Sequence, residues 1–206
     1  MATIFKGAEV NSAPNARIAA DVEALKARGV EPKLGIIRVG ERPDDLSYER
    51  TAEKRAEKLG VAVEKIVLPE DVSQAELLGV IKGVNENPLI HGVLLFRPLP
   101  KHLDEDAVCN ALAPEKDIDG ITDLSCAGVF AGKELGFAPC TPSACMEILE
   151  HYGVELRGKK AVVIGRSLVV GKPAAMMLLK RNATVTVCHT RTADLPAVCR
   201  EADVLI

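Results

Sequence analysis

The stretch AVVIGRSLVVGKPAAMMLLK, Ala161 to Lys180, decides the fold of the second half of this chain. An apolar run leads directly into Gly165, Arg166 and Ser167, and Gly171 stands where the next helix is expected to begin. Strand, glycine turn and helix in this order form the setting in which a phosphate binds at a helix N-terminus. Ser167 and Val170 replace the second and third glycines of G-x-G-x-x-G. The loop therefore fits either a nucleotide-binding loop or an ordinary tight turn.

The end of the next expected strand, residues 184–188, indicates which nucleotide this loop prefers. NAD-binding folds place an Asp or Glu about 20 residues further on, where it holds the ribose 2′-hydroxyl. This chain instead reads CHTRT over residues 188–192, with no acid. Arg166 and Arg191 suit a 2′-phosphate, because a guanidinium binds phosphate through two parallel hydrogen bonds. We therefore expect NADP in preference to NAD.

Upstream of this loop, short apolar runs alternate with helical segments, which predicts an α/β protein with largely parallel sheets. Ser73 and Glu76 have the residue types and spacing of a capping box, which predicts that a helix begins there. A stretch interrupted by Pro and Gly, residues 136–142, marks a hinge, so we expect domains over residues 1–140 and 141–206. The strand pattern at residues 204–206 breaks off, which indicates either a small second domain or a fragment. Strands are expected at 33–40, 61–68, 90–96, 160–164 and 184–188, and helices at 14–28, 46–59, 73–84 and 143–152.

Composition excludes several classes of protein. The 206 residues carry a formal net charge of -3, spread along the chain, which disfavours nucleic acid and anionic membranes as partners. No signal peptide or membrane span is predicted, so we expect a cytoplasmic protein. Its 6 cysteines form no Cys-x-x-Cys motif, and we expect them to be reduced and no metal to be bound. Aromatic residues make up 3 % and Trp is absent, which excludes platforms for stacked bases.

Polar groups of the first half gather where ligands bind in α/β folds, at the carboxyl ends of strands. The segment FRPLP, residues 96–100, follows an expected buried strand, and Asp117 and Asp119 lie around a later turn. Aspartates also cap ordinary solvated turns, so these two residues fit either a ligand-binding site or a turn with no functional role. Tyr48 lies in the helix after the first strand, where a tyrosine serves packing as readily as binding.

In combination these motifs resemble the methylenetetrahydrofolate dehydrogenase/cyclohydrolase family. The matching pieces are the Tyr48 helix, HGVLLFRPLPKHL from His91, PEKDIDG from Pro114, PCTP from Pro139 and GRSLVVGKP from Gly165, in the family's order. The resemblance implies an N-terminal folate domain, a C-terminal Rossmann domain for the nicotinamide cofactor, and an active site in the cleft between them. It also implies a homodimer, and a Rossmann sheet that continues past Ile206, so that this chain looks truncated.

The same resemblance implies the residues of the site. Asp119 matches the aspartate that accepts hydrogen bonds from the 2-amino group and ring N–H of the pterin, and Tyr48 packs on the folate or hydrogen-bonds to it, so we assign both as catalytic. The tetrahydrofolate substrate is expected to contact Tyr48, Phe96, Pro98, Leu99 and Asp119. The cofactor is expected to contact Thr141, Gly165, Arg166, Ser167, Gly171, Thr190 and Arg191.

Two departures from the family pattern concern the cyclohydrolase reaction. Bifunctional members carry a lysine four residues after the tyrosine and a glutamine before the PLP segment; here these positions are Ala52 and Phe96. Lys54 lies about 160° around the helix from the four-residue position. We therefore predict a dehydrogenase with weak or absent cyclohydrolase activity. A bifunctional enzyme that uses Lys54 or Arg97 and a non-catalytic nucleotide-binding protein remain alternatives, and a shikimate-type dehydrogenase is disfavoured.

Overall fold

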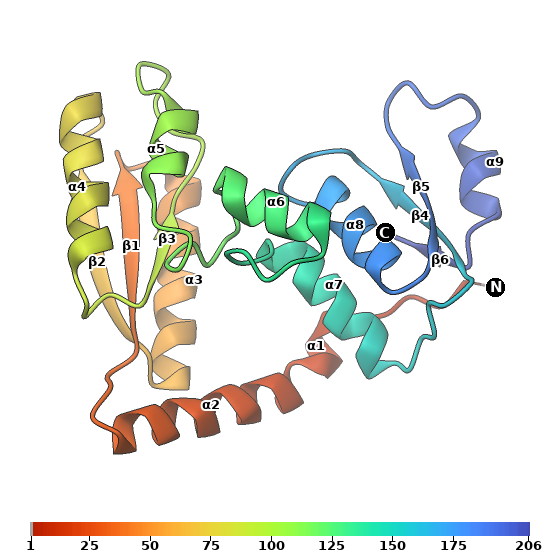
Figure 1. The fold of residues 1–206 in the computed structure, drawn as a ribbon, viewed down its shortest axis with the longest axis horizontal. Helices are drawn as coiled ribbons and strands as arrows, with labels where there is room; N and C mark the ends of the chain where they lie inside the picture. Colours follow the sequence, from red (N-terminus) through yellow and green to blue (C-terminus); the bar gives the residue numbers. More distant parts are fainter. Residues whose placement is uncertain (1) are drawn as a thin grey trace. The chain divides into compact units, whose positions relative to one another are not determined.

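The computed structural model describes residues 2–206, which form two compact units (Figure 1). The first unit is Ser12–Thr122. The second unit combines the residues up to Asn11 with Asp123–Ile206. Parallel sheets in both units confirm the α/β class.

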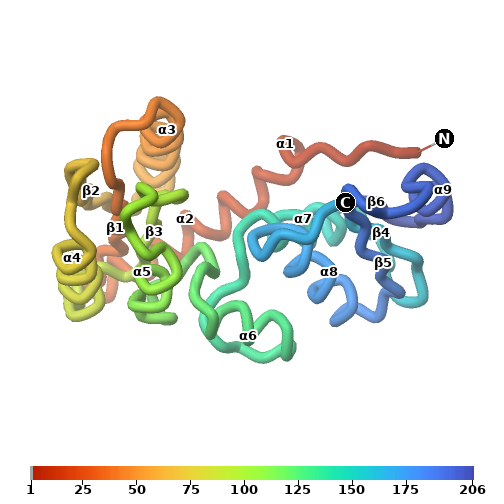
Figure 2. Tube along the Cα trace, turned by 90° about the horizontal axis from the view of Figure 1, so that it is seen from above, coloured from red at the N-terminus to blue at the C-terminus, as the bar shows by residue number. Residues whose placement is uncertain are grey.

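The first unit is a three-stranded parallel sheet of order β2-β1-β3 with helices on both faces. Helix α3 covers one face, and α4 and α5 cover the other (Figure 2). Register runs from Lys33 opposite Ala62 to Val39 opposite Leu68, and Leu34 pairs with Gly92 on the other side. The elements are α2 (Ser12–Ala27), β1 (Lys33–Val39), α3 (Pro43–Leu59), β2 (Ala62–Leu68), α4 (Gln74–Glu86), β3 (Gly92–Leu95) and α5 (Glu105–Ala111).

Alternation along β1 explains how this sheet is covered, because successive side chains of a strand point to opposite faces. Ile37 and Val39 join a buried cluster with residues of α4 and α5, among them Leu77 and Val108. The side chain of the intervening Arg38 faces α3, where it donates to the Glu49 carboxylate. The predicted capping box begins α4: the Ser73 hydroxyl accepts from the Glu76 N–H, and the Glu76 carboxylate accepts from the Ser73 N–H at 3.0 Å.

The second unit is a parallel sheet of order β5-β4-β6. Helices α7 and α8 bury their apolar faces with Ala161 and Val163 of the central strand, through Met146, Leu149, Ala174 and Leu178. The elements are α1 (Gly7–Val10), α6 (Asp123–Ala131), α7 (Cys140–His151), β4 (Lys160–Ile164), α8 (Gly171–Lys180), β5 (Thr184–Cys188), α9 (Leu195–Arg200) and β6 (Val204–Leu205).

The division between the units differs from the boundary that we expected at residues 140 and 141. Helix α6 packs against α8, and α1 packs against α7, so both belong with the second unit. Residues 136–142, where we expected a hinge between domains, lie within the second unit, and α7 already begins at Cys140 with Pro142 in its first turn. Four helices were not predicted from the sequence, namely α1, α5, α6 and α9. None of them exceeds 9 residues, and so few turns do not produce a recognisable helical period in the sequence.

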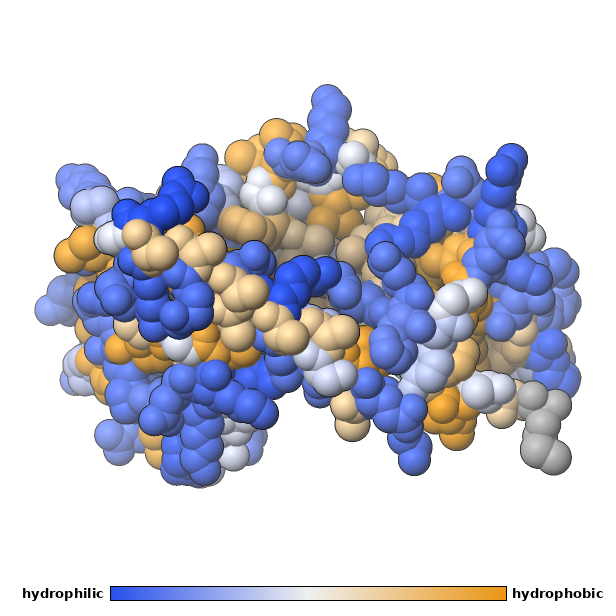
Figure 3. Space-filling view, turned by 90° about the horizontal axis from the view of Figure 1, so that it is seen from below, coloured by the Kyte–Doolittle hydropathy of each residue, from blue (hydrophilic) through white to orange (hydrophobic). Residues whose placement is uncertain are grey.

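Hydrophilic side chains cover much of the face shown in Figure 3, and hydrophobic ones gather in separate patches. Among residues 2–206, no helix combines the length and the apolar character that a membrane crossing requires.

Candidate functional site

Two aromatic side chains meet at the carboxyl end of the first unit's sheet. Phe96 follows β3 directly, is 6 % exposed, and donates its N–H to the Ile37 carbonyl at 2.9 Å. Tyr48, on α3, is 60 % exposed and contacts Phe96 edge to face, with 5.5 Å between ring centroids. Phe96 therefore supports Tyr48 from the interior and leaves most of the tyrosine side chain accessible to a ligand.

A cavity of about 370 Å³ lies along the face of α3 that carries Tyr48. Ala52, one turn after Tyr48, lines it, whereas Lys54 is exposed and is not among its lining residues. Arg55 is the cation in the lining, and its guanidinium donates to the Asn15 side-chain carbonyl. A guanidinium does not give up its proton in proteins. Among the described residues, those that line the cavity therefore include a phenol but no amine that exchanges a proton.

Charged side chains hold the loop that follows Phe96. Glu105 accepts a hydrogen bond from the Leu99 N–H at 2.7 Å, and its other carboxylate oxygen lies 3.7 Å from the Arg97 guanidinium. From α3, Arg42 makes two hydrogen bonds to Asp45, at 2.9 and 2.8 Å, and approaches the Arg97 carbonyl oxygen at 3.4 Å. The hydrogen bond with Asp45 raises the pKa of Arg42.

The Arg97–Pro98 peptide in this loop is cis. Pro98 and Leu99 follow Phe96 in this loop, which Glu105 and Arg42 hold through their contacts with Leu99 and Arg97.

The two aspartates of the later turn have different surroundings. Asp117 is 0 % exposed, and its carboxylate accepts from the N–H groups of Ile121 at 2.9 Å and Thr122 at 2.8 Å. The Val93 N–H donates to the Lys116 carbonyl at 2.7 Å and so fixes this segment beside β3. Asp117 is structural. Asp119, partly buried on the same turn, is the carboxylate better placed to meet a ligand.

A buried ion pair beside Tyr48 was missed by our sequence reasoning. Arg38 of β1 donates to the Glu49 carboxylate at 2.8 Å, and their side chains are 6 % and 7 % exposed. Lys65 lies 3.7 Å from the same carboxylate. This pair fixes α3 to the sheet at the residue next to Tyr48. An arginine within the apolar run KLGIIRV was the available signal.

The loop between β4 and α8 is folded tightly onto the start of the helix. Gly165 has φ +134°, and its N–H donates to the Cys188 carbonyl at 2.8 Å. A Cβ at Gly171 would lie 2.1 Å from the Gly165 carbonyl oxygen, so no side chain fits there. A Cβ at Gly165 would instead meet no atom within 4 Å. The loop therefore leaves open space at its glycine, as a bound phosphate requires.

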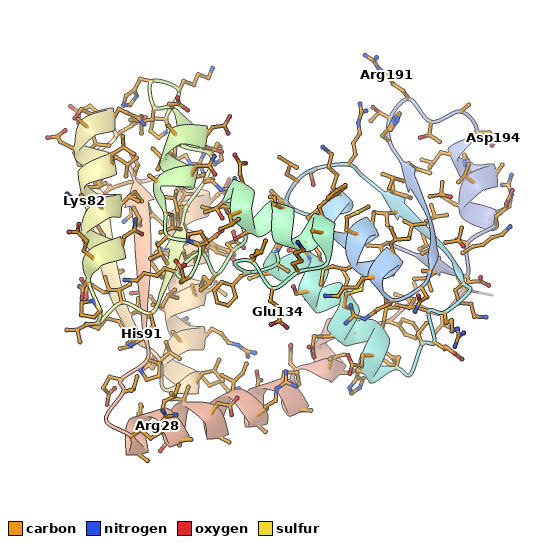
Figure 4. The ribbon with its side chains drawn as sticks, viewed as in Figure 1. Arg28, Lys82, His91, Glu134, Arg191 and Asp194 are labelled. Atoms are coloured by element: carbon orange, nitrogen blue, oxygen red, sulfur yellow. The ribbon has the colours of Figure 1, made fainter. Side chains whose placement is uncertain are left out.

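The residues expected to select the nucleotide follow two neighbouring strands of the second unit. Ile164 pairs with Cys188, so the loops with Arg166 and Arg191 leave the same edge of the sheet. The His189 N–H donates to the Thr192 hydroxyl at 2.8 Å, and the Arg191 N–H donates to His189 Nδ1 at 3.1 Å. Figure 4 shows the Arg191 side chain pointing away from this loop.

The remaining residues expected to contact the cofactor are accessible. Ser167 and Thr190 are exposed on the same two loops. Thr141 is exposed in the first turn of α7, which packs against α8. The second unit therefore gathers the two loops at one sheet edge and presents Thr141 from a separate helix.

Comparison with known proteins identifies relatives of both units. Residues 5–119 match the family model of the tetrahydrofolate dehydrogenase/cyclohydrolase catalytic domain, and residues 139–206 match that of the NAD(P)-binding domain. The Bifunctional protein FolD of Alkaliphilus oremlandii is 48 % identical over 206 residues, which cover all of this chain and 72 % of that protein. The protein of the same name from Carboxydothermus hydrogenoformans is 50 % identical over 206 residues, with the same coverage.

Solved structures that resemble this chain include enzymes of the same family. The bifunctional FolD enzyme of Campylobacter jejuni is 36 % identical with a TM-score of 0.91, covering 97 % of this chain and 69 % of that one. The methylenetetrahydrofolate dehydrogenase-cyclohydrolase of Trypanosoma brucei, solved with NADP cofactor and an inhibitor, is 32 % identical with a TM-score of 0.90, covering 100 % of this chain and 70 % of that one.

Proposed function

This chain belongs to the tetrahydrofolate dehydrogenase/cyclohydrolase family, and on that premise we propose that it is an NADP-dependent 5,10-methylenetetrahydrofolate dehydrogenase with weak or absent cyclohydrolase activity. Its product is 5,10-methenyltetrahydrofolate, an intermediate of one-carbon metabolism. The observation that carries the proposal is the Tyr48–Phe96 ring contact with Ala52 one turn further along α3. Ala52 and Phe96 are apolar, whereas the family resemblance implies a lysine and a glutamine at these two positions in bifunctional members.

The dehydrogenase reaction makes modest demands on the protein. NADP, when bound, accepts the hydride from the methylene carbon. That carbon lies between two nitrogens, so the charge left behind is delocalised and no general base is required. The protein must instead orient the substrate. Asp119 would accept two hydrogen bonds from the pterin, in the fork geometry of a carboxylate with an amidine, and the exposed Tyr48 would pack on the folate.

Hydrolysis of the methenyl product has a different requirement, because water must be added and protons moved. Positioned acid and base groups contribute about 10²- to 10⁴-fold to such a step. Neither Ala52 nor Phe96 transfers a proton, Arg55 retains its own, and Lys54 is exposed away from the cavity. We therefore expect hydrolysis to lose most of this factor while hydride transfer is kept.

The preference for NADP is supported by the second unit. Gly165 and Gly171 shape a loop with room for a phosphate, and Arg166 and Arg191 leave the same sheet edge. Their guanidiniums would bind the 2′-phosphate that distinguishes NADP from NAD. The relative from Trypanosoma brucei was solved with NADP.

Two parallel assays on the purified enzyme test the proposal. One follows NADP reduction with methylenetetrahydrofolate, and the other follows loss of added methenyltetrahydrofolate without cofactor. We expect reduction together with methenyl loss at the spontaneous rate. The double variant Ala52→Lys/Phe96→Gln is expected to accelerate methenyl loss.

Each other outcome has a distinct meaning. Accelerated methenyl loss by the unaltered enzyme would assign it the bifunctional activity that its relatives' name states, and would refute the argument from Ala52 and Phe96. Failure to bind either NADP or tetrahydrofolate would indicate a protein without catalytic activity.

A further inference from the structure

The loop Arg97–Pro100 has few backbone N–H groups with which to form hydrogen bonds. Two of its four residues are prolines, which carry no N–H. Leu99 therefore supplies one of only two backbone donors in the loop, and this donor goes to a side chain from another element, the Glu105 carboxylate at 2.7 Å. The Leu99 side chain is itself buried in the core.

Glu105 is placed for this contact by the start of α5. It is the first residue of that helix, and the preceding Asp104 caps the helix by accepting from the Ala107 N–H at 3.0 Å. The Glu105 carboxylate turns to the loop, with one oxygen on the Leu99 N–H and the other 3.7 Å from the Arg97 guanidinium. One carboxylate thus contacts both non-proline residues of the loop.

A second contact reaches the loop from α3, the helix that carries Tyr48. The Arg42 guanidinium, held by two hydrogen bonds to Asp45, lies 3.4 Å from the Arg97 carbonyl oxygen. The loop is therefore linked to the starts of two helices, while the Phe96 ring at its beginning contacts Tyr48. Movement of the loop would displace both Phe96 and the tyrosine that it supports.

We propose that Glu105 is a positioning residue for the tetrahydrofolate substrate, acting through the Leu99 N–H and the Arg97 guanidinium to fix the loop that carries Phe96, Pro98 and Leu99. This inference rests on the proposed function. Both Glu105 carboxylate oxygens contact the loop, so we expect removal of this side chain to change substrate affinity more than turnover. Binding of NADP is unaffected, because the nucleotide residues belong to the other unit.

Three variants test this role. Glu105→Ala removes both contacts, whereas Glu105→Gln keeps an oxygen that accepts from Leu99. Asp106→Ala is the matched control, because it removes an exposed acid from the same first turn of α5. The measurements are KM for methylenetetrahydrofolate, KM for NADP, kcat, Tm, and the Kd of tetrahydrofolate by calorimetry.

We expect Glu105→Ala to raise both the folate KM and the tetrahydrofolate Kd about tenfold or more, with kcat reduced less and the NADP KM unchanged. Glu105→Gln should recover most of the affinity, and Asp106→Ala should match the unaltered enzyme. A folate KM in Glu105→Ala equal to that of Asp106→Ala would overturn the inference, as would an equal rise in both KM values with a lower Tm. An unaltered enzyme that binds tetrahydrofolate but does not reduce NADP would instead refute the proposed function.

Discussion

Replacement of Gly171 by alanine tests the tight loop at the start of α8. The added Cβ would lie 2.1 Å from the Gly165 carbonyl oxygen, 2.4 Å from its carbon and 2.8 Å from the Arg166 nitrogen. All three are backbone atoms, so no side-chain rotation relieves the overlap. Ordinary contact begins near 3.4 Å, so the loop must retreat by 3.4 minus 2.1, about 1.3 Å.

This displacement sets the expected magnitudes. Overpacking of a close contact costs about 1–3 kcal/mol, and 1 kcal/mol lowers the Tm of a chain of this size by about 2–4 °C. A misplacement of about 1 Å in a positioning element costs on the order of 10²-fold in rate. We therefore expect Gly171→Ala to lower Tm by about 2–12 °C and kcat/KM for NADP about 100-fold.

Initial rates at varied NADP and thermal unfolding without ligand measure the two effects separately. Gly79→Ala is the control, because Gly79 lies within α4 and a Cβ there would meet nothing within 4 Å. Alanine should raise stability at Gly79 by about 0.5–1 kcal/mol and leave kinetics unchanged. A Gly171→Ala enzyme with unchanged Tm and NADP kinetics would refute the packing argument.

Three further predictions concern single side chains. Asp119→Asn should lower kcat/KM for methylenetetrahydrofolate at least about tenfold and leave the Kd of NADP unchanged, because one pterin donor would then face an amide N–H; intact folate turnover would remove Asp119 from the site. Arg191→Ala should weaken NADP binding and leave NAD binding unaffected, and equal losses for both nucleotides in a fluorescence titration would contradict a 2′-phosphate contact. Hydrogen bonds from Ser73 lower the pKa of Glu76, so its ionised form stabilises the fold above the pKa it has when unfolded, and this contribution disappears as pH falls through the lowered value. Urea unfolding should thus show Glu76→Gln less stable than the unaltered protein at pH 7 and equal to it in strong acid, whereas a constant difference would exclude the carboxylate as its cause.

Local patterns in the sequence predicted the parts of the structure that local chemistry determines. Glycines at 165 and 171 after an apolar run predicted the loop between β4 and α8, and Ser73 with Glu76 predicted the start of α4. Such local patterns did not predict the order of the strands in each sheet or the contacts between elements. Glu105 is six residues from Leu99 and Arg38 is eleven from Glu49, and nothing in the residues between them indicates that these side chains meet.

The boundary between the units shows the same limit. Pro and Gly around residues 136–142 indicated a break in the chain, but the contact of α6 with α8 assigns the preceding helix to the second unit. Gly128 of α6 allows the chain at Leu135 to lie against this helix within the same unit, because a Cβ there would lie 2.3 Å from the Leu135 carbonyl oxygen. A glycine in a short helix gives no indication of such a contact until the fold is known.

The contact between Tyr48 and Phe96 also couples the two positions at which this chain departs from the family pattern. Phe96 contacts the Tyr48 ring, and Ala52 lines the same cavity as Tyr48, so both positions share this tyrosine as a neighbour. Substitutions at neighbouring positions are generally not additive. We therefore expect the effects of Ala52→Lys and Phe96→Gln on methenyl hydrolysis to depend on each other in a double-mutant cycle.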